Sequence, residues 1–264
     1  MHIGAASRWP FALAAIMCST TALAHKPTVI LVHGAFENAS VWQQVQKRLK
    51  ADGFKSIAID LPGRADVPLP KVGASLDLYR DTVLRVVSGQ SSPVVLVGHS
   101  FGGMTISSVA ESAPEKIKAL VYVAAYLPAS GQSLVSLSQT DKASRMGPAF
   151  RVSEDKSTAS IDPAARGDLF CNDCGDALKK TVAASIISEP LAPMATPIKL
   201  TADHFGKVRK VYVHTSTDVV VSPSLQAAMV AATPVQREVT IDSGHSPFMT
   251  EPTALAKAIE AAAH

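Results

Sequence analysis

The chain has 264 residues, of which 47% are hydrophobic and 18% are charged. This balance supports a sizeable buried core and excludes disordered, collagen-like and coiled-coil chains. Lys and Arg total 25 against 22 Asp and Glu, a formal net charge of +3, and no run of like charges occurs, so the sequence argues against a nucleic-acid partner.

The first 24 residues have the features of an export signal. Arg8 precedes an apolar stretch at 11–18, and the small-residue pattern Ala22-Leu23-Ala24 follows, which is where signal peptidase cuts. The apolar stretch is too short to span a bilayer, which needs about 20 residues. We therefore expect a signal peptide at 1–24, a mature domain at 25–264, and export to the periplasm or the medium.

Three cysteines are present, and their contexts differ. Cys18 lies in the leader without the small residue directly before it that lipidation requires, so lipidation is the minor alternative. Cys171 and Cys174, in Cys-Asn-Asp-Cys, could pair in an oxidising compartment. The spacing also suits redox catalysis or half a zinc site, but no strand-to-helix turn or second pair accompanies it. We expect a structural disulfide or unpaired structural cysteines, and no metal.

From residue 28 onward, short β-branched runs alternate with stretches of helical periodicity. The predicted strands are 28–32, 55–59, 93–97, 119–124, 209–213 and 237–241. The predicted helices are 40–51, 75–88, 102–112, 223–232 and 252–263. Several strands are apolar on both faces, as in a buried parallel sheet. The alternation predicts an α/β fold with an about six-stranded, mostly parallel sheet flanked by helices.

One interval interrupts the alternation. Between about 128 and 203 no clear core strand occurs, and Ser, Asp, Pro and Ala are frequent. A loop of that length in a compact domain needs structure of its own. We expect a small, mainly helical cap inserted before the last two strands, with 175–188 as its clearest helix and 189–197 as a Pro-punctuated return.

The strongest chemical motif follows the third predicted strand. Gly98-His99-Ser100-Phe101-Gly102 matches Gly-x-Ser-x-Gly between a buried strand and a helix, the setting of a nucleophile elbow. The sharp turn strains the serine backbone, so the residues two positions on either side must be small. A glycine-rich turn that only packs a helix on a strand is the weaker alternative. Ser100 is therefore the predicted nucleophile.

A serine hydroxyl needs a neighbouring imidazole as its base. Among the eight histidines, those at the chain ends and the cap boundary are poorly placed, and His99 in the elbow is expected to point away. His245 lies in a Gly-containing loop after the last strand, where the ligand-facing groups of an open α/β sheet gather. It is the predicted base. His33 is expected to organise the backbone of the first loop, and His214 is expected to make a hydrogen bond at the end of a strand.

The imidazole must in turn be oriented by a carboxylate. Asp218 follows the fifth predicted strand and gives the chain order Ser100, Asp218, His245 that hydrolases of this architecture have. Asp242 lies only three residues from His245, and Asp203 precedes its strand, so both are weaker candidates. Asp218 is the predicted acid, and loop capping is its alternative role.

Acyl transfer also needs backbone N–H groups that stabilise the tetrahedral oxyanion. The first strand ends in His33-Gly34-Ala35-Phe36, whose small residues let the backbone approach a substrate. We expect the N–H groups of Ala35 and Phe101 to form the oxyanion hole and Phe36 to line the acyl pocket. This chemistry needs no cofactor.

These residues resemble the α/β-hydrolase superfamily, and more narrowly the plant methylesterase and hydroxynitrile lyase family with its bacterial esterase relatives. The resemblance covers almost all of the mature chain. It is carried by HGAF, VVLVGHSFGGM, KIKALVYVAAYLP, and KVRKVYVHTSTDVVVSP with SGHSPFMTEP. It implies a compact α/β-hydrolase fold whose small cap corresponds to 128–203.

Two positions separate lyases from esterases within that family. The lyases carry a threonine after the first-loop histidine and a lysine after the catalytic histidine, whereas this chain has Gly34 and Ser246. Without that hydroxyl and ammonium, cyanohydrin cleavage loses its electrostatic support. The resemblance implies hydrolysis of small to medium apolar carboxylic esters, such as aryl, methyl or pyrethroid-like esters. Lactonase or hydroxynitrile lyase activity and a non-catalytic small-molecule receptor are the alternatives.

Overall fold

The computed structural model describes residues 1–2, 4, 26–64, 66–71 and 73–264. The signal peptide expected at 1–24 lies almost entirely outside the described residues. In the described part of the chain, no helix is both long enough and apolar enough to cross a membrane.

A six-stranded sheet forms the centre of the protein, in the order β2-β1-β3-β4-β8-β9. The strands are β1 (Val29–Val32), β2 (Ser56–Ile59), β3 (Val94–His99), β4 (Ile117–Val123), β8 (Lys210–Thr215) and β9 (Arg237–Ile241). Every neighbouring pair is parallel. Apolar side chains on both faces of the central strands are buried because helices cover both faces. The predicted α/β fold is confirmed.

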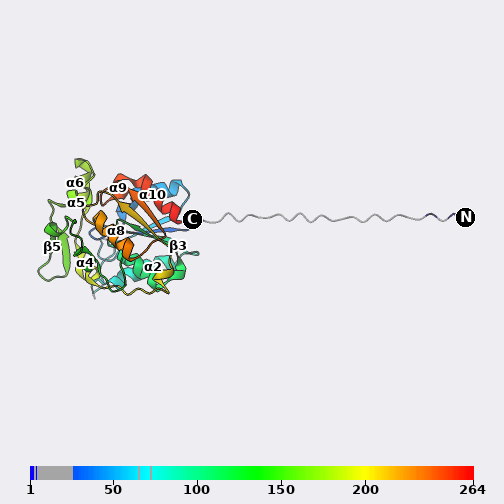
Figure 1. Cartoon of the computed structure of the whole chain (residues 1–264), viewed down its shortest axis with the longest axis horizontal. Helices are drawn as coiled ribbons and strands as arrows, with labels where there is room; N and C mark the ends of the chain where they lie inside the picture. The colour runs from blue at the N-terminus through cyan, green and yellow to red at the C-terminus, as the bar shows by residue number, and fades with distance from the viewer. Residues whose placement is uncertain (3, 5–25, 65, 72) are drawn as a thin grey trace.

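Helices pack on both faces of the sheet (Figure 1). The main helices are α1 (Gln43–Ala51), α2 (Leu76–Ser88), α3 (Gly102–Ser112), α8 (Pro223–Ala232), α9 (Pro247–Thr250) and α10 (Pro252–Ala262). Leu49 of α1 and Ile259 of α10 pack with Leu31 on one face. Val83 of α2 packs with Ile30 on the other face, which α3 and α8 also cover. Short 3₁₀ turns lie at Ala39–Trp42, Pro114–Lys116, Gly147–Ala149 and Phe205–Lys207.

The cap lies between β4 and β8, and its labelled elements gather at one end of the molecule (Figure 1). Its helices are α4 (Leu134–Ser138), α5 (Arg166–Phe170), α6 (Asp176–Ser185) and α7 (Leu191–Ala195). Its strands are β5 (Phe150–Val152), β6 (Thr158–Ile161) and β7 (Glu189–Pro190), which form a small antiparallel sheet. This sheet was not predicted, because strands of two to four residues show no clear alternation.

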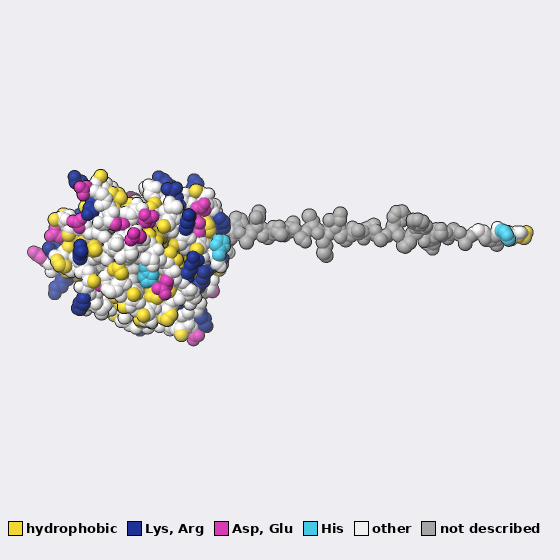
Figure 2. All heavy atoms as spheres, turned by 45° about the horizontal axis from the view of Figure 1, so that its top comes forward, with side chains coloured by type: hydrophobic (Ala, Val, Ile, Leu, Met, Phe, Trp, Pro, Cys, Tyr) yellow, Lys and Arg dark blue, Asp and Glu magenta, His cyan; other side chains and the backbone are white. Residues whose placement is uncertain are grey.

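Charged side chains of both signs are interspersed over the face shown in Figure 2. Ion pairs of the protein surface include Arg151 with Asp162 at 3.2 Å and Lys179 with Asp168 at 2.6 Å. Exposed pairs of this kind contribute little to stability. The buried core on the two faces of the sheet is therefore the main source of stability.

Candidate active site

Ser100 lies at the sharp turn between β3 and α3. Its φ of 50° falls in the left-handed region, which costs a non-glycine residue about 1–3 kcal/mol. A Cβ added at Gly98 would lie 2.6 Å from the carbonyl oxygen of Gly102, so a side chain there would block the turn. The Ser100 N–H donates to the Val123 carbonyl at 3.2 Å, and its carbonyl accepts from the Tyr126 N–H at 3.0 Å. These bonds hold the turn against β4.

Asp218 and His245 meet at the carboxyl edge of the sheet, in the loops that follow β8 and β9. The His245 Nδ1 lies 2.8 Å from the Asp218 Oδ2, and both side chains are fully buried. Among the described residues, the His245 Nε2 has no hydrogen-bond partner although it is buried. The structure thus brings the expected base and acid into direct contact and leaves the second ring nitrogen unused.

Several donors fix the orientation of the Asp218 carboxylate. Its Oδ1 accepts from the backbone N–H groups of Val220 at 2.7 Å and Val221 at 3.0 Å. Its Oδ2 accepts from the Thr215 hydroxyl at 3.0 Å. Because both oxygens are engaged, the carboxylate cannot turn away from His245 without breaking these bonds.

Ser100 and His245 are linked through the residue next to the serine. The His99 Nε2 lies 2.8 Å from the His245 carbonyl oxygen, and the centroids of the two rings are 4.6 Å apart. His99 does not line the cavity above Ser100, as expected. Within the described residues the Ser100 hydroxyl has no hydrogen-bond partner. Catalytic hydrogen bonds are often long in unliganded sites and tighten when substrate binds.

A buried acid lies beneath the site and pairs with His99. The Glu37 Oε2 lies 2.9 Å from the His99 Nδ1 and accepts from the Gly34 N–H at 3.0 Å. Burial opposes charge on both groups, yet Glu37 raises the pKa of His99 and His99 lowers the pKa of Glu37. Their mutual attraction therefore favours the ionised pair, and the bond from the Gly34 N–H to Glu37 fixes the first loop. Glu37 was not predicted as a site residue, because a lone glutamate in a loop gives no sign of burial.

The loop after β1 carries the backbone groups expected to bind an oxyanion. Phe36 has a φ of 66°, and its N–H donates to the Glu189 Oε2 at 2.9 Å. In the part of the chain that the structure describes, the N–H groups of Ala35 and Phe101 have no acceptor. Ala35 borders the cavity together with Ser100. The two expected oxyanion donors are thus left unpaired.

Glu189, from the cap strand β7, is buried and has three partners. Its Oε2 lies 2.5 Å from the Arg64 Nη2, and its Oε1 accepts from the Tyr79 hydroxyl at 3.0 Å. Burial raises the pKa of Glu189, although Arg64 opposes the shift. Since Glu189 also binds the Phe36 N–H, this network ties the cap to the first loop. Its members lie far apart in the chain, so no local pattern predicted it.

A cavity of about 380 Å³ opens above Ser100. Most of its wall is apolar and comes from the first loop and the cap, and the contributing aromatic side chains are Phe36, Phe150, Phe170 and Tyr126. The Phe36 ring packs edge-on against Phe150 and Phe170, with centroids 6.3 and 6.2 Å apart. Phe170 packs in the same way against His245 at 5.9 Å. A mainly apolar pocket with a few polar groups suits a small apolar ligand.

The two competing histidines have other partners. The His33 Nε2 accepts from the Leu61 N–H at 3.2 Å, and its Nδ1 lies 2.7 Å from the Gly34 carbonyl oxygen. Burial lowers the pKa of His33 to about 3, so the ring stays neutral. The His214 Nε2 lies 2.9 Å from Glu238 on the neighbouring strand. Both histidines therefore stabilise local structure.

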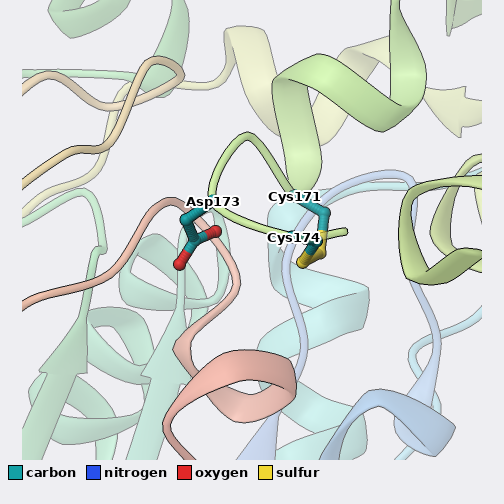
Figure 3. Close-up of side chains that lie close together, drawn as sticks. All are labelled: Cys171, Asp173 and Cys174. Atoms are coloured by element: carbon teal, nitrogen blue, oxygen red, sulfur yellow. A yellow bond between two sulfur atoms is a disulfide. The ribbon is translucent and has the colours of Figure 1, made fainter. Parts of the chain in front are cut away.

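Cys171 and Cys174 are joined by a disulfide (Figure 3). The Asp173 carboxylate lies near them (Figure 3), and one of its oxygens and the two sulfurs all lie within 4.8 Å of one another. Disulfide sulfurs are not thiolates and do not ligate a metal as thiolates do. The cysteine pair thus fits a structural role.

Known proteins resemble this chain at the level of sequence. A sequence model of the alpha/beta hydrolase family matches residues 29–258. Putative methylesterase 11, chloroplastic, of Arabidopsis thaliana is 31% identical over 242 residues, which cover 86% of this chain and 62% of that protein. Methyl jasmonate esterase 1 of Vitis vinifera is 27% identical over 244 residues, covering 84% of this chain and 91% of that one. The chain thus spans less than two thirds of the Arabidopsis protein.

Solved structures resemble it at the level of the fold. A pyrethroid hydrolase from Sphingobium faniae has a TM-score of 0.80 and 24% identity, covering 90% of this chain and 97% of that chain. At 24% identity, this similarity shows that the two proteins share a fold.

Proposed function

Because the chain belongs to the alpha/beta hydrolase family, we propose that it is a serine carboxylesterase that cleaves small to medium apolar esters through an acyl-enzyme. One observation carries the proposal: His245 contacts Asp218 at 2.8 Å and also contacts His99 of the elbow, and its buried Nε2 has no partner among the described residues. A buried nitrogen without a hydrogen-bond partner lowers the stability of the fold. A role in accepting the Ser100 proton would explain why this nitrogen is left without one. The relatives named as methylesterases support ester chemistry.

The first half of the proposed reaction forms the acyl-enzyme. The Ser100 side chain rotates toward the His245 Nε2, which takes its proton as Oγ attacks the ester carbonyl carbon. Asp218 holds the imidazole in the required tautomer and stabilises the imidazolium. The N–H groups of Ala35 and Phe101 donate to the oxyanion. His245 then protonates the leaving alcohol as the tetrahedral intermediate collapses.

The second half releases the acid. Water enters after the alcohol has left, and the His245 Nε2 removes its proton as the water oxygen attacks the acyl carbon. The same two N–H donors stabilise the second oxyanion. Collapse of this intermediate breaks the bond to the Ser100 Oγ, which regains its proton from His245. Each step uses only groups of this chain and water.

The cavity supports the choice of substrate. Its volume of about 380 Å³ is at the small end of ligand pockets, which range over about 300–1,000 Å³. Phe36, Phe150 and Met146 lie on its wall, so an apolar acyl or aryl group gains more from binding than a charged one. Cyanohydrin cleavage is not favoured, because no lysine lies among the described residues that border the cavity.

We also propose that the protein is exported. The leader pattern at 1–24 supports export, and the pairing of Cys171 with Cys174 suits an oxidising compartment. Fractionation of expressing cells, followed by intact-mass measurement, should find the protein outside the cytoplasm and beginning at His25. A full-length cytoplasmic product would contradict export.

Hydrolysis of p-nitrophenyl acetate and butyrate between about pH 6 and 9 tests the proposed chemistry, because the catalytic base must be neutral for activity. The Ser100→Ala variant should lose activity by about 10⁴-fold or more. Ser138→Ala is the matched control, because Ser138 also borders the cavity but its hydroxyl donates to the Val135 carbonyl of its own helix. Equal turnover by wild type and Ser100→Ala, or none by either, would contradict the proposal.

A further inference from the structure

We propose that the disulfide-closed loop Cys171–Cys174 positions the Asp218–His245 pair from the cap side, through Asn172 and Asp173. This inference rests on the proposed function and names two positioning residues for it. Neither residue touches the reacting atoms. Each instead holds one of the two loops that carry the pair.

The loop itself is closed in two ways. The Cys174 N–H donates to the Cys171 carbonyl at 3.0 Å, which makes a tight turn, and the disulfide joins the same two residues. Cys171 is fully buried and follows Phe170, which packs against the His245 ring. A disulfide across so few residues restricts the unfolded chain little. Its main effect is therefore local, on the conformation of the two residues between the cysteines.

The first contact reaches the loop that carries the acid. The Asn172 Nδ2 donates to the carbonyl oxygen of Thr217 at 2.8 Å. Thr217 directly precedes Asp218 and is itself exposed to solvent. The Thr217 N–H donates to the Ser243 carbonyl at 3.1 Å, which links this loop to the histidine loop. Asn172 therefore fixes a peptide group adjacent to the acid.

The second contact reaches the loop that carries the base. The Gly244 N–H, directly before His245, donates to the Asp173 Oδ2 at 2.8 Å. A Cβ added at Gly244 would lie 2.7 Å from the Asp173 Oδ1 and would also overlap the Asn172 amide. The histidine loop and the disulfide loop are therefore packed together as closely as a glycine allows.

These contacts determine where the His245 ring points. The ring is joined to Asp218 by one hydrogen bond, and small displacements of a catalytic group cost up to about 100-fold in rate. The charge-assisted bond from the Gly244 N–H to Asp173 is of the stronger kind. Loss of either contact should therefore lower kcat while the cavity, which binds substrate, is unchanged.

The test compares variants at residue 173 in the full chain. Asp173→Ala removes the acceptor and should lower kcat on p-nitrophenyl acetate by about 10-fold or more with KM nearly unchanged. Asp173→Asn keeps an acceptor oxygen and should retain most of the wild-type kcat. Glu154→Ala, an exposed cap carboxylate, is the matched control and should behave as wild type. Wild-type kcat in Asp173→Ala, or an equal loss in Asp173→Asn, would overturn the proposal.

The disulfide is tested separately. Dithiothreitol transfers two electrons and two protons to the bond, which leaves Cys171 and Cys174 as thiols and the reagent as a cyclic disulfide. Reduction should lower kcat of the wild type to the level of the Cys171→Ser/Cys174→Ser double variant and leave that variant unaffected. A reduced wild type, verified by thiol alkylation and mass measurement, that retains full kcat would contradict a role for the disulfide.

A proton NMR signal separates failure of this inference from failure of the proposed function. The proton between the His245 Nδ1 and Asp218 should give a downfield resonance that His245→Ala removes. If Asp173→Ala shifts or broadens it while Glu154→Ala does not, the positioning role stands even if the wild type hydrolyses no ester. If the resonance and kcat are both unchanged in Asp173→Ala, the positioning role is wrong while the esterase proposal survives.

Discussion

The strand-end loops and the cap both border the cavity, but they reach it by different routes. Ser100, Asp218 and His245 each lie in the turn or loop that follows a parallel strand of the sheet, β3, β8 and β9, so the order of the sheet brings them to one edge. Phe150 and Phe170 come from short cap elements whose positions depend on contacts between distant segments. This difference suggests that the sheet edge supplies the chemistry and the cap supplies selectivity and alignment.

The largest effect is expected at the sheet edge. Asp218→Asn keeps the shape of the side chain but loses the charge that orients His245, so kcat on p-nitrophenyl butyrate should fall by about 10⁴-fold. Asp242→Asn is the matched control, because Asp242 is exposed and its Oδ1 accepts from the Ser216 hydroxyl. An equal loss of kcat in the two variants would contradict the assignment of Asp218 as the catalytic acid of the triad.

The next effect lies where the cap meets the sheet edge. Arg64→Met leaves the Glu189 carboxylate buried without its ion-pair partner, so the free energy of unfolding should fall by about 3–5 kcal/mol. Replacing both members, in Arg64→Met/Glu189→Leu, should recover much of this loss, because no charge is then left buried. Urea unfolding measures both, and a single variant as stable as wild type would argue that the cap is not anchored here.

A smaller effect depends on pH and concerns the first loop. Burial lowers the pKa of His33 to about 3, whereas an unfolded histidine titrates near about 6.5. Between these values the unfolded chain binds a proton that the folded protein does not, so His33 makes the free energy of unfolding fall as pH drops, by up to about 1.4 kcal/mol per pH unit.

The His33→Gln variant isolates this contribution. It cannot bind that proton, so its unfolding free energy should depend less steeply on pH below about 6.5. Urea unfolding of both proteins across this window gives the two slopes. Parallel curves would mean that His33 titrates in the folded protein as it does in the unfolded one.

The smallest effect should come from the cap alone. Phe150→Ala enlarges the cavity, so longer p-nitrophenyl esters should fit better. The kcat/KM for a long ester divided by that for a short one should rise several-fold, which corresponds to about 1 kcal/mol in relative transition-state binding. Val152→Ala lies on the same strand but is 48% exposed, and its ratio should stay that of wild type. An unchanged ratio in Phe150→Ala would mean that the acyl group does not bind against the cap.

The same contrast explains what the sequence predicted. The six strands, the elbow and the insertion point of the cap were predictable, because apolar runs and Gly-x-Ser-x-Gly are local patterns. The buried acids Glu37 and Glu189 were not, since their burial depends on His99 and Arg64, which no spacing reveals. The antiparallel strands of the cap were also missed, because their pairing is set by tertiary contacts.

The central claim is that His245 activates Ser100 as a nucleophile. The most direct measurement is covalent labelling with a fluorophosphonate, followed by peptide mass spectrometry to locate the adduct. We expect one adduct, on Ser100, that forms rapidly in wild type and Asp242→Asn and far more slowly in His245→Ala. An adduct on another residue, or a labelling rate that does not depend on His245, would contradict it.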